Sequence, residues 1–230
     1  MKLIQTILSG DPNFRFWPNP GESHPKAFIR LNDGQSLLQK AFLRGHKLPG
    51  LQEVLTVTNR ELFFSTEDEY REVNVHGLPT NFMLEPMGRG TAPALIAAGL
   101  QVAQTHGLDA LMLVLPADHL IERQDVFEAA VEQAVSLAEQ GQWVALGVKP
   151  TGPETAYAYF ELADQGVASL HNKPDLDQAK AMVSSGRHVW NTGIYCFSAA
   201  TLLGQAQQHA SELLAAVKHC LQGSRAYSGR

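Results

Sequence analysis

The chain has 230 residues, of which 44% are hydrophobic, enough for the core of one large domain or two small ones. Its formal net charge of −5 gives no basic footprint, so we expect no nucleic-acid partner. No apolar stretch approaches the about 20 residues that a membrane helix needs, and residues 1–9 lack the layout of a signal peptide. Two cysteines, Cys196 and Cys220, are too few for a disulfide framework. These features favour a cytoplasmic protein without a membrane partner.

Strand and helix patterns alternate along the first two thirds of the chain. Short apolar runs predict strands over Leu3–Leu8, Val54–Val57, Asn81–Leu84, Leu111–Leu115 and Val144–Val148. Apolar residues at helical spacing predict helices over Ser36–Arg44, Thr91–Gln104 and Val126–Glu139. This alternation predicts an α/β three-layer sandwich with a mostly parallel, Rossmann-like sheet.

The pattern changes after Thr155. Shorter strand-like pieces follow at Tyr157–Leu162 and Val167–Leu170, then a helix over Leu176–Ser184 and a strand over Thr192–Phe197. Asp175 and Asp177 fall at the start of that helix, where carboxylates cap free N–H groups. We expect this second region to extend the same sheet.

One carboxylate stands directly beyond a predicted strand. The apolar run Leu111–Leu115 stops at Pro116, and Asp118 follows. Ligands of open α/β sheets bind beyond the carboxyl ends of the strands, and Mg²⁺ usually takes one or two carboxylates together with phosphate oxygens. Asp118 is therefore a candidate magnesium ligand; alternatively, it only caps the next helix.

Several motifs occur in a fixed order. They are Leu8–Pro18 with Glu22–Phe28, Glu85–Pro93, Leu115–His119, Pro150–Tyr159, Lys173–Asp175 and Trp190–Ile194. They resemble, in turn, LSGGxGxRLWPxSRxxxPKQF, EPxGRNTAP, LPADH, PTxPETGYGY, the end of FVEKPD, and WNSGMF. Each motif alone is weak, but the ordered set resembles the sugar-nucleotide pyrophosphorylases, specifically the bacterial mannose-1-phosphate guanylyltransferases.

The resemblance implies a fold of the nucleotide-diphospho-sugar transferase type and a nucleotidyl transfer. A sugar 1-phosphate would attack the α-phosphorus of GTP and release pyrophosphate, with Mg²⁺ as cofactor. Expected partners are GTP or a GDP-sugar and a sugar 1-phosphate, with a homo-oligomer as a further expectation. Residues 1–150 would form the nucleotide-binding half, 151–225 the sugar-phosphate-binding half of the same domain, and 226–230 a tail.

The resemblance also assigns site residues. Catalytic roles fall to Arg15, Lys26 and Asp118, with Asp118 as the metal ligand. Nucleotide binding falls to Ser9, Gly10, Arg15, Glu85, Gly88, Arg89, Thr91 and Pro116. Sugar-phosphate binding falls to Glu154, Tyr157, Asn172, Lys173 and Asn191. An arginine fork and a mobile lysine charge suit phosphate, although both basic residues could instead be solvated loop residues.

The chain also departs from the family pattern. Asp11, Pro12 and Asn13 replace residues of the glycine-rich loop, which adds a negative charge and removes an N–H donor where phosphates should lie. Asn172 replaces a glutamate, and no counterpart of the family's second metal-binding aspartate is found. Three interpretations stay open: an active guanylyltransferase-like enzyme, a catalytically impaired relative with a binding, regulatory or structural role, and a different catalyst on the same scaffold.

The nine histidines show no zinc-binding spacing. No His-x-x-x-His or Cys-x-x-Cys pattern occurs, so we expect no histidine to bind a metal. His24, His119 and His171 fall near the expected site. We expect His119 to support the site without touching the ligand, or to start a helix.

Overall fold

The computed structural model describes residues 1–10 and 25–224. The predictions at Asp11, Pro12, Asn13, Arg15 and His24 lie outside the described residues. The chain divides into two compact units. The first unit comprises Met1–Trp143 and Cys196–Arg230, and the second comprises Val144–Tyr195. The predicted boundary at residue 150 separates a nucleotide-binding half from a sugar-phosphate-binding half. The two units are defined by compactness and not by ligand binding, so this boundary stays a prediction.

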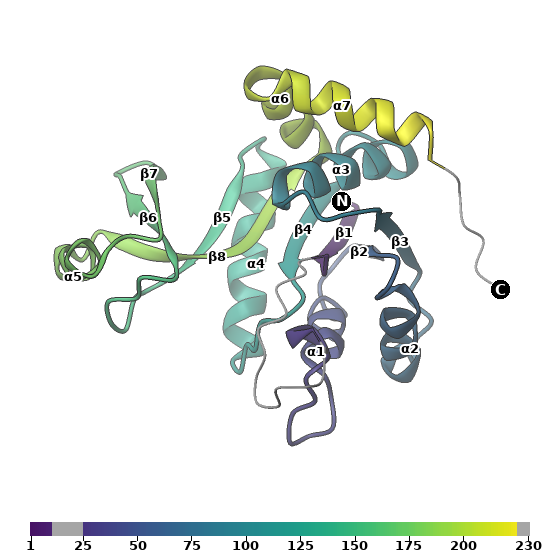
Figure 1. Cartoon of the computed structure of the whole chain (residues 1–230), viewed down its shortest axis with the longest axis horizontal. Helices are drawn as coiled ribbons and strands as arrows, with labels where there is room; N and C mark the ends of the chain where they lie inside the picture. The colour runs from purple at the N-terminus through teal and green to yellow at the C-terminus, as the bar shows by residue number, and fades with distance from the viewer. Residues whose placement is uncertain (11–24, 225–230) are drawn as a thin grey trace. The chain divides into compact units, whose positions relative to one another are not determined.

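Four parallel strands form the sheet of the first unit (Figure 1). They are β1 (Leu3–Leu8), β2 (Leu51–Asn59), β3 (Thr80–Glu85) and β4 (Leu111–Pro116), in the order β3-β2-β1-β4. β1 and β4 are almost wholly buried, which explains their continuous apolar sequences. Leu8 pairs with both Val57 and Pro116, so the carboxyl ends of these strands meet at one edge of the sheet.

Helices cover the sheet of the first unit on both faces (Figure 1). The predicted helices are confirmed as α1 (Leu37–Leu43), α3 (Thr91–His106) and α4 (Gln124–Glu139). A short 3-10 helix, η1, spans Lys26–Phe28. Sequence patterns did not indicate α2 (Phe63–Val73), α6 (Ala199–His209) or α7 (Ser211–Gln222). Few apolar residues of α2 are buried, so this helix lacks the wide apolar stripe that patterns detect. In α7, Leu213, Leu214 and Val217 do lie at helical spacing, and they pack against Ile96 and Ala206.

The second unit contains β5 (Val144–Val148), β6 (Ala158–Leu162), β7 (Val167–Asn172), α5 (Leu176–Ser185) and most of β8 (His188–Ser198). β6 is antiparallel to both β7 and β8, and β5 pairs with β8. Asp175 and Gln178 form a capping box that begins α5, which confirms Asp175 as a cap. Gly186 ends the helix in the left-handed conformation, with φ of 66°.

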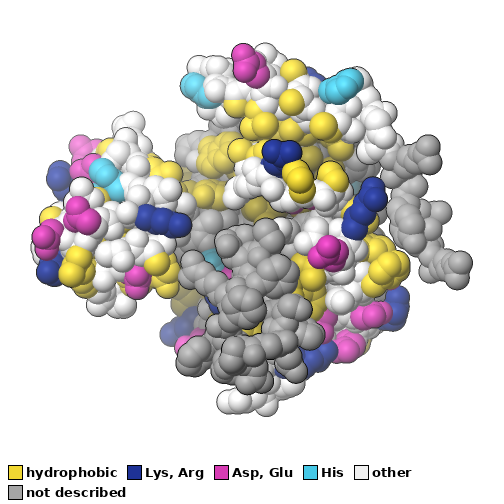
Figure 2. Space-filling view, viewed as in Figure 1, with side chains coloured by type: hydrophobic (Ala, Val, Ile, Leu, Met, Phe, Trp, Pro, Cys, Tyr) yellow, Lys and Arg dark blue, Asp and Glu magenta, His cyan; other side chains and the backbone are white. Residues whose placement is uncertain are grey.

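The strands join in the order β3-β2-β1-β4-β8-β6-β7, which confirms the predicted α/β fold with a mostly parallel sheet around the N-terminal strands. Acidic and basic side chains are interspersed on the face that Figure 2 shows. Every helix in the described part of the chain is too short or too polar to traverse a bilayer.

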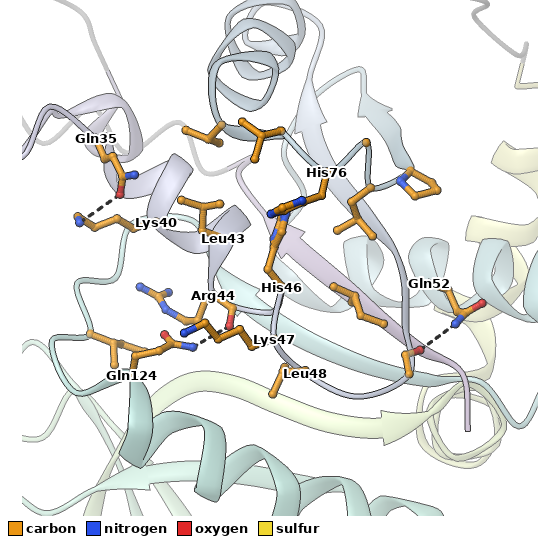
Figure 3. A pocket seen from close by; sticks show the side chains of 18 residues that line it. Gln35, Lys40, Leu43, Arg44, His46, Lys47, Leu48, Gln52, His76 and Gln124 are labelled. Carbon is orange, nitrogen blue, oxygen red and sulfur yellow. Dashed lines mark hydrogen bonds between the residues drawn. The ribbon is translucent and has the colours of Figure 1, made fainter.

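A cavity with a volume of about 870 Å³ lies at the amino ends of β2 and β3. His46, after α1, and His76, after α2, point into it with ring centroids 6.4 Å apart (Figure 3). None of the site residues predicted from the sequence lines this cavity. It lies at the opposite ends of the strands from the motifs.

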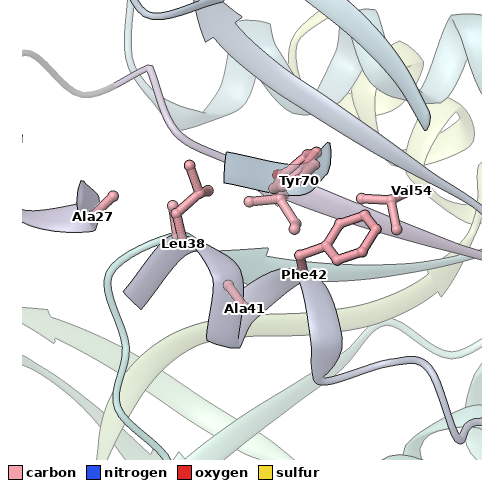
Figure 4. Packing of buried hydrophobic residues seen from close by; sticks show 8 residues of the cluster. Ala27, Leu38, Ala41, Phe42, Val54 and Tyr70 are labelled. Atoms are coloured by element: carbon pink, nitrogen blue, oxygen red, sulfur yellow. The ribbon is translucent and has the colours of Figure 1, made fainter. Parts of the chain in front are cut away.

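A buried cluster beside α1 packs against β1 and β2 and includes Ala117, which directly follows β4 (Figure 4). Phe42 packs on Tyr70 with ring centroids 4.4 Å apart, and the Tyr70 hydroxyl lies 2.8 Å from Thr56 Oγ1. The same cluster contains Ala27 and Ala117. These two alanines adjoin Lys26 and Asp118 in the sequence, so core packing fixes the backbone that carries both candidate catalytic residues.

Candidate functional site

A cavity of about 280 Å³ lies at the carboxyl ends of the strands in the first unit. Four residues predicted to bind the nucleotide line it: Gly10, Glu85, Gly88 and Thr91. They come from two motifs that the sequence separates widely, one after β1 and one after β3. The parallel topology brings them together because β1 and β3 end at the same edge, and α3 begins there.

Gly10 and Glu85 are in close contact across this cavity. A Cβ atom on Gly10 would lie 2.6 Å from Glu85 Oε2. Glu85 is half-buried, and this burial raises the pKa of its carboxyl group. Glycine at position 10 therefore allows the Glu85 carboxylate to stay against the end of β1.

The N-terminus of α3 forms another wall of the cavity. Gly90 precedes the helix with φ of 89°, a conformation that favours glycine, and no side chain caps the helix. The first N–H groups of a helix have no partner within it and attract anions. Arg89 and Thr91 are exposed at this end. Glycine in place of the family's asparagine thus fits the local backbone.

Two further predicted residues lie in the strand ends themselves. Ser9 is buried, its N–H donates to Val57 O at 2.8 Å, and its carbonyl accepts from Thr58 Oγ1 at 3.3 Å. Pro116 ends β4 opposite Leu8. Both residues shape the edge of the sheet, but neither lines the cavity.

Lys26 and Asp118 form an ion pair with 3.1 Å between Nζ and Oδ2. Their side chains are 49% and 39% exposed, so both remain accessible to a ligand. The alternative that Asp118 caps the next helix is wrong, because α4 begins at Gln124 after an N-cap at Arg123. His119 does not start that helix either. Asp118 is thus a free-standing carboxylate beside a lysine at the end of β4.

Arg44 holds the segment after Asp118, and sequence reasoning missed it. Its Nη2 donates to His119 O at 2.8 Å, and its guanidinium carbon lies 5.9 Å from the centre of the Phe127 ring. Burial lowers the pKa of Arg44 to about 10 and also lowers the pKa of His119. A single arginine at the end of a predicted helix gives no sequence signal for this role.

The predicted sugar-phosphate residues lie in the second unit. The Lys173 N–H donates to Tyr157 O at 3.2 Å, and the Tyr157 ring meets Trp190 edge-on with centroids 5.2 Å apart. Asn191 Oδ1 accepts from the Gly193 N–H at 2.8 Å. Asn172 pairs with Ala158 in the β6–β7 register. Lys173, Tyr157 and Asn172 thus lie around one end of β6, and Asn191 follows Trp190 on the adjacent strand β8.

Glu154 reaches the same region through Tyr159, a residue that sequence reasoning did not single out. The Tyr159 hydroxyl donates to Glu154 O at 3.0 Å and accepts from the Glu154 N–H at 2.8 Å. Tyr159 is fully buried, so it anchors the loop before β6. Lys173 has φ of 49°, which favours glycine or asparagine and fixes its direction after β7.

The nucleotidyl transferase family model matches residues 4–228. The chain is 38% identical to a mannose-1-phosphate guanylyltransferase of Klebsiella pneumoniae over 93% of its length and 46% of the relative's length. It is 37% identical to a protein of the same name from Escherichia coli, with the same coverage of both chains. The chain therefore spans about half the length of these curated relatives.

Two solved structures are also similar. A mannose-6-phosphate isomerase from Helicobacter pylori superposes with a TM-score of 0.85 at 28% identity, covering 99% of this chain and 83% of that one. A structure described as a mannose-1-phosphate geranyltransferase from Thermus thermophilus gives a TM-score of 0.82 at 30% identity, covering 98% of this chain and 66% of that one.

Nucleotidyltransferases of this kind generally use a divalent metal ion. Asp118 fits that need, because it offers an accessible carboxylate at the end of a parallel strand. The family model, the relatives and the cavity at the strand ends all agree with the motifs. The chain belongs to the nucleotidyl transferase family and resembles its mannose-1-phosphate guanylyltransferases.

Proposed function

We propose that the chain transfers a guanylyl group from GTP to mannose 1-phosphate and releases pyrophosphate. The observation that carries this proposal is the convergence of Gly10, Glu85, Gly88 and Thr91 on one cavity at the strand ends. The names of the relatives supply the base and the sugar. Synthesis from GTP is expected in the cytoplasm, where the triphosphate is made.

Glu85 is suited to bind guanine. Guanine presents hydrogen-bond donors on its ring and amino nitrogens, and an ionised carboxylate only accepts hydrogen bonds. Its half-buried position strengthens such bonds relative to water. Gly10 and Gly88 leave room for the base to approach the backbone. The same carboxylate would disfavour a base that presents acceptors in these positions.

The triphosphate would lie between the N-terminus of α3 and Lys26. Free N–H groups at the helix end stabilise phosphate charge, and the lysine is already within ion-pair distance of Asp118. A phosphate oxygen of the sugar attacks the α-phosphorus, the bond to the bridging oxygen of the β-phosphate breaks, and pyrophosphate carries away the electron pair. Catalysis then consists mainly of positioning and charge neutralisation.

Asp118 would hold the metal ion, which we propose to be Mg²⁺. A bound Mg²⁺ ion would offset the negative charge of the phosphate groups. Asp118 keeps its accessible carboxylate at the strand end, and Lys26 is free to turn from it toward a phosphate. In the second unit, Lys173 would neutralise the sugar phosphate, and Glu154, Asn172 and Asn191 would hydrogen-bond to hydroxyl groups beside Tyr157.

Pyrophosphate release tests the proposal. The native chain should release pyrophosphate from GTP only when mannose 1-phosphate and Mg²⁺ are both present. Asp118→Asn should lower this rate about 100-fold or more, because it removes the charge but keeps the side-chain size. Asp125→Asn is the matched control, because Asp125 is a solvent-exposed aspartate paired with Arg123 in the same unit. Equal rates for native protein and Asp118→Asn would contradict the role of Asp118.

The altered loop provides a second arm of the test. Asp11→Gly, Pro12→Ser and Asn13→Gly together restore the kind of residue that phosphate loops use. If the native chain binds GTP in calorimetry but releases no pyrophosphate, while the restored variant does, the chain is an impaired binding protein. If the native chain turns over as fast as the restored variant, the result supports an active enzyme. It also contradicts the idea that Asp11, Pro12 and Asn13 impair the loop.

A further inference from the structure

Three potential metal ligands meet on the sheet of the second unit. Glu161 on β6, His171 on β7 and His188 on β8 offer ligand atoms that all lie within 4.8 Å of one another. We propose that these residues bind a divalent transition metal ion of the Zn²⁺ class. This site shares no residue with those assigned to the proposed guanylyl transfer.

The strand register places the three side chains on one face. Glu161 pairs with Ser169 on β7 and with His188 on β8. His171 lies two residues beyond Ser169 and therefore shares its face, because side chains alternate along a strand. Directly paired and diagonal residues on adjacent strands are close enough to contact. An ion bound here would link three strands.

His188 is held in the tautomer that a metal needs. The Ser185 hydroxyl donates its hydrogen to Met182 O at 2.7 Å, and the same oxygen lies 2.8 Å from His188 Nδ1. Since the hydroxyl hydrogen is already used, Nδ1 donates to Ser185, and Nε2 of the neutral ring keeps its lone pair. Metal-binding histidines are commonly oriented through their other nitrogen in this way.

Glu161 and His171 are already linked through one hydroxyl group. Ser169 Oγ donates to Glu161 Oε2 at 3.0 Å and lies 2.8 Å from His171 Nε2, while Oε2 and Nε2 are 3.8 Å apart. Because the Ser169 hydrogen goes to Glu161, His171 Nε2 donates to Ser169 Oγ. An ion about 2.0–2.2 Å from each ligand would replace this hydroxyl bridge with small side-chain movements, once the His171 ring proton moves from Nε2 to Nδ1. The two side chains are 28% and 39% exposed, so an ion can reach them.

The ligand set determines the class of metal. Two imidazoles and one carboxylate suit Zn²⁺, with water as a fourth ligand, whereas Mg²⁺ prefers oxygen ligands. The positive charge of Arg187 would repel a bound cation, because Arg187 Nη2 lies 3.5 Å from Glu161 Oε1. The proposal departs from our expectation that no histidine binds a metal, which rested on the spacing of histidines and cysteines in the sequence. Ligands on three strands leave no short motif in the sequence.

Zn²⁺ titration against a chromogenic chelator tests the site in the full chain. All proteins carry Cys220→Ser, because Cys220 is an exposed thiol that could bind Zn²⁺ itself. His188→Gln and Glu161→Gln should each weaken Zn²⁺ binding tenfold or more, and Ser185→Ala should weaken it about tenfold through loss of orientation. His209→Gln, at the end of α6, is the matched histidine control and should bind like the parent.

Arg187→Gln keeps the test decisive if a ligand variant fails to fold. Removing this cation should tighten Zn²⁺ binding, which loss of folding cannot do. In the parent, Zn²⁺ should also slow hydrogen exchange in β6, β7 and β8. Asp118→Asn should leave Zn²⁺ binding unchanged, so a failed guanylyl transfer would not touch this proposal. Absence of Zn²⁺ binding by the parent, or equal affinity of the parent and His188→Gln, would overturn it.

Discussion

The two compact units arrange their candidate ligand groups in different ways. In the first unit the groups follow the carboxyl ends of parallel strands, with Gly10 after β1, Glu85 at the end of β3 and Asp118 after β4. In the second unit, Glu161 and His171 lie within antiparallel strands and share a face. A strand end and its loop form one continuous motif, whereas a shared face is assembled from separate strands. The first kind of site can therefore be read from the sequence more easily.

The units also differ in how deeply their structure is buried. Strands β1 and β4 are almost wholly buried, whereas β7 alternates between exposed and partly buried residues. We therefore expect substitutions beneath the strand ends of the first unit to lower stability more than those on β7. The following variants test this difference, beginning with the largest expected loss of stability.

Phe42→Ala should have the largest effect on stability. Phe42 is fully buried in the cluster that carries Ala27 and Ala117, and its truncation should lower the free energy of unfolding by about 3–5 kcal/mol. Leu170→Ala on β7 should change it by less than about 0.5 kcal/mol, because Leu170 is 56% exposed. Urea unfolding followed by circular dichroism measures both. Similar losses for the two variants would break the comparison between the units.

Gly10→Ala should affect binding rather than folding. The new Cβ would displace the Glu85 carboxylate, which is the movable end of a side chain, so the strand can stay in place. We expect GTP affinity to fall about tenfold, equivalent to about 1.4 kcal/mol, with little change in melting temperature. Gly152→Ala is the control, because no atom lies within 4 Å of its added Cβ. Unchanged GTP affinity in Gly10→Ala would contradict the assigned contact.

The two capping boxes compare the units directly. Ser36 is fully buried and hydrogen-bonds to both the Gln39 N–H and Glu69, whereas Asp175 caps α5 at the surface. Ser36→Ala should lower the free energy of unfolding by about 2 kcal/mol and Asp175→Ala by about 1 kcal/mol. Hydrogen exchange should show faster opening of α5 only in the second variant. A larger loss for Asp175→Ala would reverse the expected order.

Two helical glycines in the first unit should change stability in opposite directions. Gly204 has free space around its Cβ position in the exposed face of α6, so Gly204→Ala should add about 0.5–1 kcal/mol of stability. In α3, a Cβ on Gly99 would lie 2.5 Å from Leu202 Cδ2. Gly99→Ala should therefore lower stability by about 1 kcal/mol or more. Thermal unfolding measures whether the two variants change stability in opposite directions. An equal gain of stability in both would show that α3 and α6 pack loosely.

Much of the fold could be predicted because its information is local. Continuous apolar runs indicated β1 and β4, and alternating strands and helices indicated the parallel sheet. Helix α2 could not be predicted, because its burial depends on α1 and the core around Tyr70 rather than on a strong apolar stripe. Similarly, the motifs predicted four of the residues that line the cavity at the strand ends, but they did not indicate Val57 or Ala94 in that cavity, or Arg44.

The sequence by itself determined the strands, the motifs at their ends and the Asp175 cap, because each depends on residues that are neighbours along the chain. Tertiary structure alone decided three relationships: the Lys26–Asp118 ion pair, the support of His119 by Arg44, and the meeting of Glu161 with its two histidines. Each depends on strand order and register, which hydrophobic packing of the whole sheet sets. The spacing of residues along the chain does not predict these distances across the sheet.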